Sequence, residues 1–341
     1  MSQQGTYPIG ARILAAIDTL TGVVTGKTAD VPLSSLLTFM ATGLLTTPVT
    51  LGQVQSVNGG QLAGFRNRII NGGMQVAQRG NTAIINGNII YGGCDRYISA
   101  MFGFGSGSGT IQQVQIPGPT TGYWNAIAAF TTTGAGTLGQ YHRIEAKNCQ
   151  DLNNKTITIS AKVYQDTGST LTLTTTLAGA TALDTFTSTT TIGAPQAISL
   201  SSGVVTPVSY PVTLGASSAA NGLQVGFTLA ANAHASKNFF VADVQLEIGS
   251  VATPFEQRPY GMELVLCQRY FQLKHAAVTT TSVNQNVSLL TQMRAQPTVG
   301  TVTFDAGTGA TFGSLAGGDG IYQTANHSQV ATATVPLTAE I

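Results

Sequence analysis

Alternation of apolar and polar residues, in short runs rich in Thr, Val and Ile, is the feature that most limits how this chain can fold. It is clearest in residues 155–164, where Ile157, Ile159, Ala161 and Val163 alternate with more polar residues. Successive side chains of a strand point to opposite faces of a sheet. We therefore expect these four side chains to share one buried face.

Many such runs occur between residues 66 and 258, including 239–248 and the Thr-rich stretch 167–191. Pairs of glycine or asparagine and two closely spaced prolines separate them. Many short strands joined by loops are typical of sandwiches and jelly rolls. We predict an all-β chain in which residues 66–258 form a jelly-roll β-sandwich.

Residues 1–65 have a different pattern and are predicted to be a short N-terminal attachment region. After Pro32, four apolar residues recur at helical spacing: Leu33, Leu36, Leu37 and Met40. A short helix with one apolar stripe cannot bury that stripe by itself. It needs a partner chain or a neighbouring domain.

The pattern changes again after Pro259. Met262, Leu266, Arg269 and Tyr270 fall at helical spacing, so residues 259–275 are predicted to be a short helical connector. Residues 276–341 return to Thr, Val and Gly and are predicted to form a smaller C-terminal β-domain.

The charge content limits the partners. Lys and Arg number 15 and Asp and Glu 14, so only 9% of the 341 residues are charged, against roughly 25% in an ordinary domain. Scattered basic residues and a net charge of +1 argue against binding to nucleic acid. No apolar run reaches the length of about 18 residues that membrane insertion needs. Burial of surface in an oligomer would also reduce the need for charge.

The metal-binding and redox-active residue types form no motif. Cys94, Cys149 and Cys267 lie far apart, and we expect buried free thiols in a protein made in a reducing cytoplasm. The first residues do not resemble a signal peptide. The four histidines are isolated. We therefore expect no metal and no cofactor.

Seven charged residues make up much of the charge of the sandwich segment: Arg68, Arg79, Asp95, Arg96, Glu247, Glu256 and Arg258. A glycosidase needs two carboxylates about 5–10 Å apart, and three of these residues could supply them. Arginines close to two of the three carboxylates favour the alternative, a structural polar network of ion pairs. We expect a structural and binding protein and not an enzyme.

Tyr123 and Trp124, which is the only tryptophan, form a candidate ligand site. Aromatic rings stack on sugars, so a glycan could bind there. The alternative is an anchor in the core or in a subunit interface, where buried aromatic rings contribute most. The Gly-rich stretch 307–320 is a further candidate for ligand contact.

Three stretches together resemble a pattern in tail fibres and related receptor-binding proteins of tailed bacteriophages. They cover residues 66–341 in a fixed order. The first contains Asn67-Arg68-Ile69-Ile70-Asn71-Gly72-Gly73-Met74, Gln78-Arg79-Gly80 and Asp95-Arg96-Tyr97. The second contains residues 244–249 and Ala252-Thr253-Pro254-Phe255-Glu256-Gln257-Arg258. The third contains Glu263-Leu264, Cys267-Gln268-Arg269-Tyr270-Phe271, Met293-Arg294, Pro297 and Ala339-Glu340.

The resemblance implies a jelly roll and a small β tip in a parallel homotrimer, carried on the phage tail in the virion. Our hypothesis is that residues 1–65 bind other tail or baseplate proteins, with Leu33, Leu36, Leu37 and Met40 as the virion-attachment surface. The function that we expect is attachment to a bacterial surface receptor, either a glycan or an outer-membrane protein. The alternatives are a polysaccharide-degrading fibre, a carbohydrate-binding module or adhesin of a bacterium, and a structural collar or decoration protein.

Overall fold

The computed structural model describes residues 65–115, 122–278, 286–305, 310–314, 320–323 and 331–341. All of them belong to one compact unit, Gln55–Ile341. The predicted attachment stripe of Leu33, Leu36, Leu37 and Met40 lies outside the described residues, as does most of the stretch 307–320.

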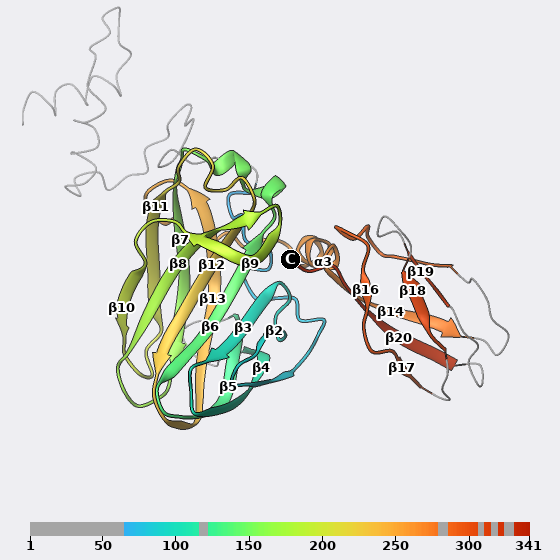
Figure 1. The fold of residues 1–341 in the computed structure, drawn as a ribbon, viewed down its shortest axis with the longest axis horizontal. Helices are drawn as coiled ribbons and strands as arrows, with labels where there is room; N and C mark the ends of the chain where they lie inside the picture. Colours follow the sequence, from blue (N-terminus) through green and yellow to red (C-terminus); the bar gives the residue numbers. More distant parts are fainter. Residues whose placement is uncertain (1–64, 116–121, 279–285, 306–309, 315–319, 324–330) are drawn as a thin grey trace, which may run out of the picture. The chain divides into compact units, whose positions relative to one another are not determined.

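Two antiparallel sheets form the larger part of this unit, as predicted (Figure 1). The first sheet has the order β1 (Thr82–Ile85), β4 (Ser106–Gln115), β5 (Tyr123–Thr133), β13 (His234–Ile248), β7 (Thr156–Gln165) and β11 (Thr206–Thr213). The second has the order β10 (Gln196–Leu200), β8 (Leu171–Ala182), β12 (Leu223–Ala231), β6 (Gly136–Ile144), β3 (Tyr97–Phe102) and β2 (Ile89–Tyr91), and β9 (Thr185–Thr191) pairs with β8.

The alternation in strand β7 produces the buried face that the sequence predicts. Ile157, Ile159, Ala161 and Val163 are all buried in a continuous core shared by the two sheets. Burial of apolar side chains between two sheets is the main stabilising term of such a sandwich. The chain is therefore all-β with a jelly-roll-like β-sandwich, which confirms the predicted fold class.

Helix α3 (Tyr260–Gln268) follows the sandwich, beginning directly after Pro259. Strand β14 (Phe271–Val278) begins three residues after the helix ends. The predicted helical connector over 259–275 was therefore too long, because residues from 271 onward pair with a strand instead of continuing the helix.

The C-terminal region is a smaller β-structure, as predicted. One sheet has the order β14, β20 (Ala331–Thr338) and β16 (Thr298–Val299), and β17 (Thr303–Phe304) also pairs with β20. A second sheet has the order β15 (Asn286–Ser288), β19 (Gly320–Gln323) and β18 (Phe312–Ser314). The C-terminal region has a small hydrophobic core of its own, which includes Met293, Ile321, Val335 and Leu337.

Candidate functional site

A buried ion pair joins the start of the sandwich to helix α3. Arg258 Nη1 lies 2.9 Å from Glu263 Oε1. The other terminal nitrogen, Nη2, donates to the carbonyl oxygens of Asn67 at 2.7 Å and Ile69 at 2.6 Å. The backbone N–H of Asn71 donates to the second oxygen of Glu263 at 2.7 Å. We call Asn67, Ile69, Asn71, Arg258 and Glu263 the Arg258 network.

Burial determines the electrostatics of the Arg258 network. Removal from water raises the pKa of the Glu263 carboxyl, while Arg258 and the Asn71 N–H oppose that rise. The backbone is close-packed here as well, because a Cβ at Gly72 would collide with the carbonyl oxygen of Val244. Glycine is therefore required directly after Asn71, where the first stretch of the resemblance has its two glycines.

A second network joins the sandwich to the C-terminal end of the chain. Glu340 forms ion pairs with both Arg96 and Arg79, the latter at 3.0 Å. Arg79 also lies 4.0 Å from Asp95, and burial raises the pKa of the Asp95 carboxyl while Arg79 lowers it. The guanidinium carbon of Arg96 lies 3.5 Å from the ring centre of Tyr270. We call Arg79, Asp95, Arg96, Tyr270 and Glu340 the Glu340 network.

The predicted polar network forms only in part: of its seven residues, only Arg79 and Asp95 form an ion pair with each other, at 4.0 Å. Asp95 contacts Arg79 and not its neighbour Arg96, which reaches Glu340 instead. Arg68 belongs to neither network and pairs with Asp151 at the surface, at 2.8 Å. Asp95 and Arg96 lie in a turn just before β3, where Arg96 has a φ of 72°, so closeness in sequence is a poor guide to ion pairing here.

The two remaining predicted carboxylates bind neutral groups. Glu247 accepts hydrogen bonds from the backbone N–H and hydroxyl of Thr253, at 2.7 and 2.6 Å, and from Gln245 at 2.9 Å. Glu256 accepts one from the backbone N–H of Asn67 at 2.7 Å. The expected pairing of Glu256 with Arg258 does not occur, because Arg258 is directed to Glu263.

Trp124 and Tyr123 lie on opposite faces of strand β5. Trp124 is 1% exposed and its ring centre lies 6.5 Å from that of Phe240 in the core. A sugar cannot stack on a ring buried in this way, so the ligand hypothesis at Trp124 is corrected in favour of its alternative, a core anchor. Tyr123 is 40% exposed and stays open to contact.

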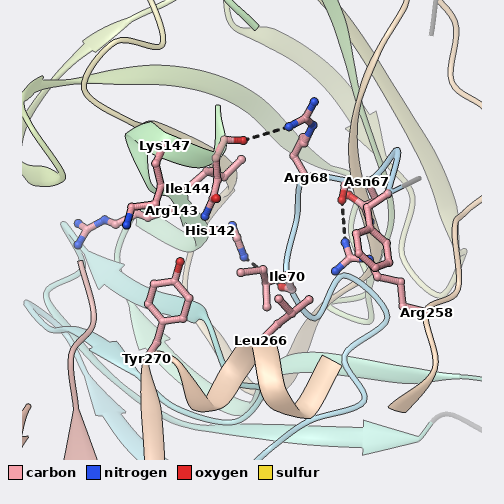
Figure 2. Close-up of a pocket in the computed structure, with 12 residues that line it drawn as sticks. Asn67, Arg68, Ile70, His142, Arg143, Ile144, Lys147, Arg258, Leu266 and Tyr270 are labelled. Carbon is pink, nitrogen blue, oxygen red and sulfur yellow. Dashed lines mark hydrogen bonds between the residues drawn. The ribbon is translucent and has the colours of Figure 1, made fainter. Parts of the chain in front are cut away.

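An open pocket of about 210 Å³ lies beside the Arg258 network (Figure 2). Four of its lining side chains are basic: Arg68, Arg143, Lys147 and Arg258. Figure 2 shows Asn67, Arg68 and Arg258 on one side and Arg143 and Lys147 on the other, with His142 between them. Among the described residues that line the pocket there is no carboxylate.

His142 adds no charge to this pocket. Its Nε2 lies 3.1 Å from the carbonyl oxygen of Ile70, so this nitrogen must carry the proton. Burial lowers the pKa of His142 well below its usual value, and the nearby Arg96 lowers it further. The ring is therefore neutral at physiological pH.

The basic side chains around the pocket differ in their partners. Arg258 is paired with Glu263, and Arg68 with Asp151. Arg143 donates to Gln224 at 2.9 Å and to an oxygen of Ile341 at 2.7 Å, and neither of these residues lines the pocket. Lys147 is exposed. Lys147 is therefore the basic side chain left to contact a small anionic group, such as the carboxylate of an acidic sugar.

Sequence reasoning missed His142, Arg143 and Lys147, which lie on β6 and in the short helical turn Ala146–Asn148. They come close to Arg258 only through the fold. Glu263 and Glu340 were present in the resembling stretches but had not been assigned a partner. Within the described ranges no cluster of three or more His, Cys, Asp or Glu could hold a metal ion, and no helix is long and apolar enough to cross a membrane.

Comparison with known proteins gives similarity to solved structures alone, because no family model and no curated protein matches the chain. A carbohydrate-binding module solved with β-1,4-galactotriose (TmCBM61) is 8% identical with a TM-score of 0.32, covering 54% of this chain and 99% of that one. The xylan-binding CBM22-1 domain of Paenibacillus barcinonensis Xyn10C is 14% identical with a TM-score of 0.32, covering 56% and 100%. The enzymatically active domain of bacteriophage CBA120 tailspike protein 4 is 9% identical with a TM-score of 0.31, covering 54% and 21%. At these TM-scores the neighbours carry no argument about function.

Proposed function

We propose that this chain is a structural component of a bacteriophage tail fibre and attaches the virion to a glycan on a bacterial surface. The observation that carries the proposal is the meeting of the three resembling stretches in space. Arg258 and Glu263 contact residues 67–71, and Glu340 contacts Arg79 and Arg96, although up to 261 residues separate the partners. The sequence pattern thus corresponds to one architectural feature, the junction of sandwich, helix and C-terminal region.

The proposed binding place is the basic pocket. Pockets for drug-sized ligands are roughly 300–1,000 Å³, so a pocket of about 210 Å³ fits one sugar unit at most. Such a site binds weakly by itself. A homotrimer would present three copies, and simultaneous binding to a polymeric glycan would raise the overall affinity.

The proposal assigns binding and not cleavage to this chain. Asp95, Glu247 and Glu256, the three candidate acids, all accept hydrogen bonds from protein groups. None of the three lines the pocket. A polysaccharide-degrading activity would need a pair of carboxylates facing a common substrate groove.

Binding of the fluorescently labelled full chain to bacterial cells and to purified acidic and neutral surface polysaccharides tests the proposal. Lys147→Glu should weaken binding to an acidic polysaccharide roughly tenfold, because it removes a charge-assisted contact and adds repulsion. Lys155→Glu changes an exposed lysine that does not line the pocket and is the matched control.

Equal binding by the two variants would remove the pocket from the proposal. Failure of the unaltered chain to bind any cell or polysaccharide would favour the collar or decoration alternative. Release of new reducing ends from a polysaccharide would favour the degrading fibre.

A further inference from the structure

Two glycines lie inside strands of the second sheet, at positions where larger residues are usual. Gly139 belongs to β6 and Gly226 to the adjacent β12. Glycine in the interior of a strand weakens it and often marks a place where another group approaches the backbone closely. The group that approaches both of these glycines is the side chain of Tyr141.

The ring of Tyr141 lies flat against the outer face of this sheet. A Cβ on Gly139 would be 2.6 Å from the hydroxyl oxygen of Tyr141, and a Cβ on Gly226 would be 2.9 Å from its ring. Non-bonded carbon atoms need about 3.5 Å or more, so only glycine leaves room for the ring at both positions. Tyr141 is half-buried, whereas Gln140 and His142 point to the other side of the sheet and are buried. One face of the ring therefore contacts the backbone of two strands, and the other face is directed away from the sheet.

Neutral polar side chains border the outward face of the ring. Thr176 on β8 is directly opposite Gly226, and Thr228 on β12 is directly opposite Gly139. Both threonines are half-buried. A sugar has an apolar face made of C–H groups and carries its hydroxyl groups at the edge. An aromatic ring with hydroxyl groups around it therefore suits a sugar unit.

The outer face of the sheet continues from Tyr141 to the basic pocket. Arg143, which lines the pocket, lies on the same face of β6 as Tyr141, about 7 Å further along the strand. Its Nε donates to the side chain of Gln224 on β12 at 2.9 Å. Gln224 is two residues before Gly226, on which the ring lies. A chain of sugar units that enters the pocket at one end can therefore follow this face to Tyr141.

We propose that Tyr141 is a second contact for the glycan, on which a further sugar unit stacks while another unit occupies the pocket. The ligand is then an oligosaccharide with an acidic unit near Lys147 and a unit with an open apolar face over Tyr141. The inference rests on the proposed function and deepens it. The pocket holds one unit at most, and Tyr141 adds a subsite for the same polymer.

Fragments of different length test this assignment. The surface polysaccharide that the unaltered chain binds most tightly is hydrolysed, and its single sugar units and longer fragments are titrated separately. The affinity of the unaltered chain should rise roughly tenfold with fragment length, and Tyr141→Leu should lose this gain while binding the single unit as before. Tyr141→Phe keeps the ring and should retain the gain. Tyr260→Leu removes another exposed tyrosine, away from the pocket lining, and is the matched control.

A purely structural role predicts a different outcome. A ring that only covers the two glycines would lower stability when removed, without any dependence of binding on fragment length. Three results would overturn the inference: an unaltered chain that gains nothing with fragment length, a Tyr141→Leu variant that keeps the full gain, or an equal loss by Tyr260→Leu.

A second measurement applies if circular dichroism shows that Tyr141→Leu is unfolded. In the unaltered chain labelled at its tyrosines, the NMR signal of Tyr141, identified by its absence in Tyr141→Phe, should shift when the longer fragments are added. An unchanged signal overturns the inference. A chain that binds no polysaccharide contradicts the proposed function, and the inference with it. Binding that is weakened by Lys147→Glu but is normal in folded Tyr141→Leu contradicts the Tyr141 subsite alone.

Discussion

The sandwich and the C-terminal region are both antiparallel β-structures, but they are stabilised differently. The core of the sandwich contains 42 buried hydrophobic residues among those described, and that of the C-terminal region contains seven. Since apolar burial is the main source of folding free energy, the sandwich can be stable by itself. The C-terminal region depends more on its attachments.

Those attachments are mainly polar and lie at one end of the antiparallel pair of β14 and β20, where Phe271 is opposite Thr338. The side chain of Gln78 donates to the carbonyl oxygen of Phe271 at 3.0 Å, where β14 begins. Glu340 and Ile341, just after β20, are held by Arg79, Arg96 and Arg143. The comparison teaches that one region is fixed by its interior and the other by ion pairs and hydrogen bonds to its neighbour.

The largest effect should come from the interior of the sandwich. Trp124→Ala removes a buried ring from the packed core and should lower the free energy of unfolding by about 3–5 kcal/mol. Chemical denaturation followed by circular dichroism measures the loss, and Trp124→Phe should lose less. A Trp124→Ala variant of normal stability would break the comparison and return the ring to the list of ligand-binding candidates.

A smaller and more local effect should follow from Glu340→Gln. The change leaves buried Arg96 without its carboxylate, so the C-terminal region should lose about 3 kcal/mol. Hydrogen exchange of the β20 amides should accelerate, while the fluorescence transition of the single tryptophan, which reports the sandwich, should be unchanged.

The ion pair between Arg68 and Asp151 at the surface provides the control for Glu340→Gln. Asp151→Asn breaks the ion pair with Arg68, in which the Asp151 side chain is 48% exposed, and should cost no more than about 0.5 kcal/mol. A loss of stability in the sandwich upon Glu340→Gln, equal to the loss in the C-terminal region, would mean that the two regions unfold as one unit.

An effect smaller than those of Trp124→Ala and Glu340→Gln should be a pH dependence from His142. Its pKa is lowered in the folded state, so below about pH 6.5 the unfolded chain takes up a proton that the folded chain does not. The stabilisation is complete above that pH and is lost as the pH falls, by up to about 1.4 kcal/mol per pH unit. The raised pKa values of Asp95 and Glu263 act in the opposite direction.

The comparison of unaltered chain and His142→Gln isolates this contribution. The glutamine amide can still donate to the Ile70 carbonyl but does not titrate. When the pH is lowered from about 7.5 to about 5.5, the melting temperature should fall more for the unaltered chain than for the variant. An equal fall would show that His142 is not the group responsible.

Local pattern was sufficient to predict the strands but not their partners. The alternation in residues 155–164 predicts β7 and its buried face, because side-chain direction in a strand depends only on position. The same rule says that Tyr123 and Trp124 point to opposite faces, but not which of them points inward. That choice depends on which sheet packs against β5.

Helix α3 shows the same limit. Met262 and Leu266 at helical spacing predict a helix but not which of its residues are buried. The structure buries Glu263, because Arg258 provides a buried counter-ion for it. The partnership of Arg96 with Glu340 was equally beyond prediction, since 244 residues separate them and local spacing contains no information about such a contact.

The Arg258 network also determines how mechanical load would travel through the chain. Arg258, where the chain leaves the sandwich, binds the carbonyl oxygen of Asn67, where the chain enters it, at 2.7 Å. Tension between the preceding and following segments would therefore cross this short contact instead of running along the strands. The sandwich would remain outside the path of the force, so a pull on the chain would load a few buried hydrogen bonds and one ion pair before any sheet.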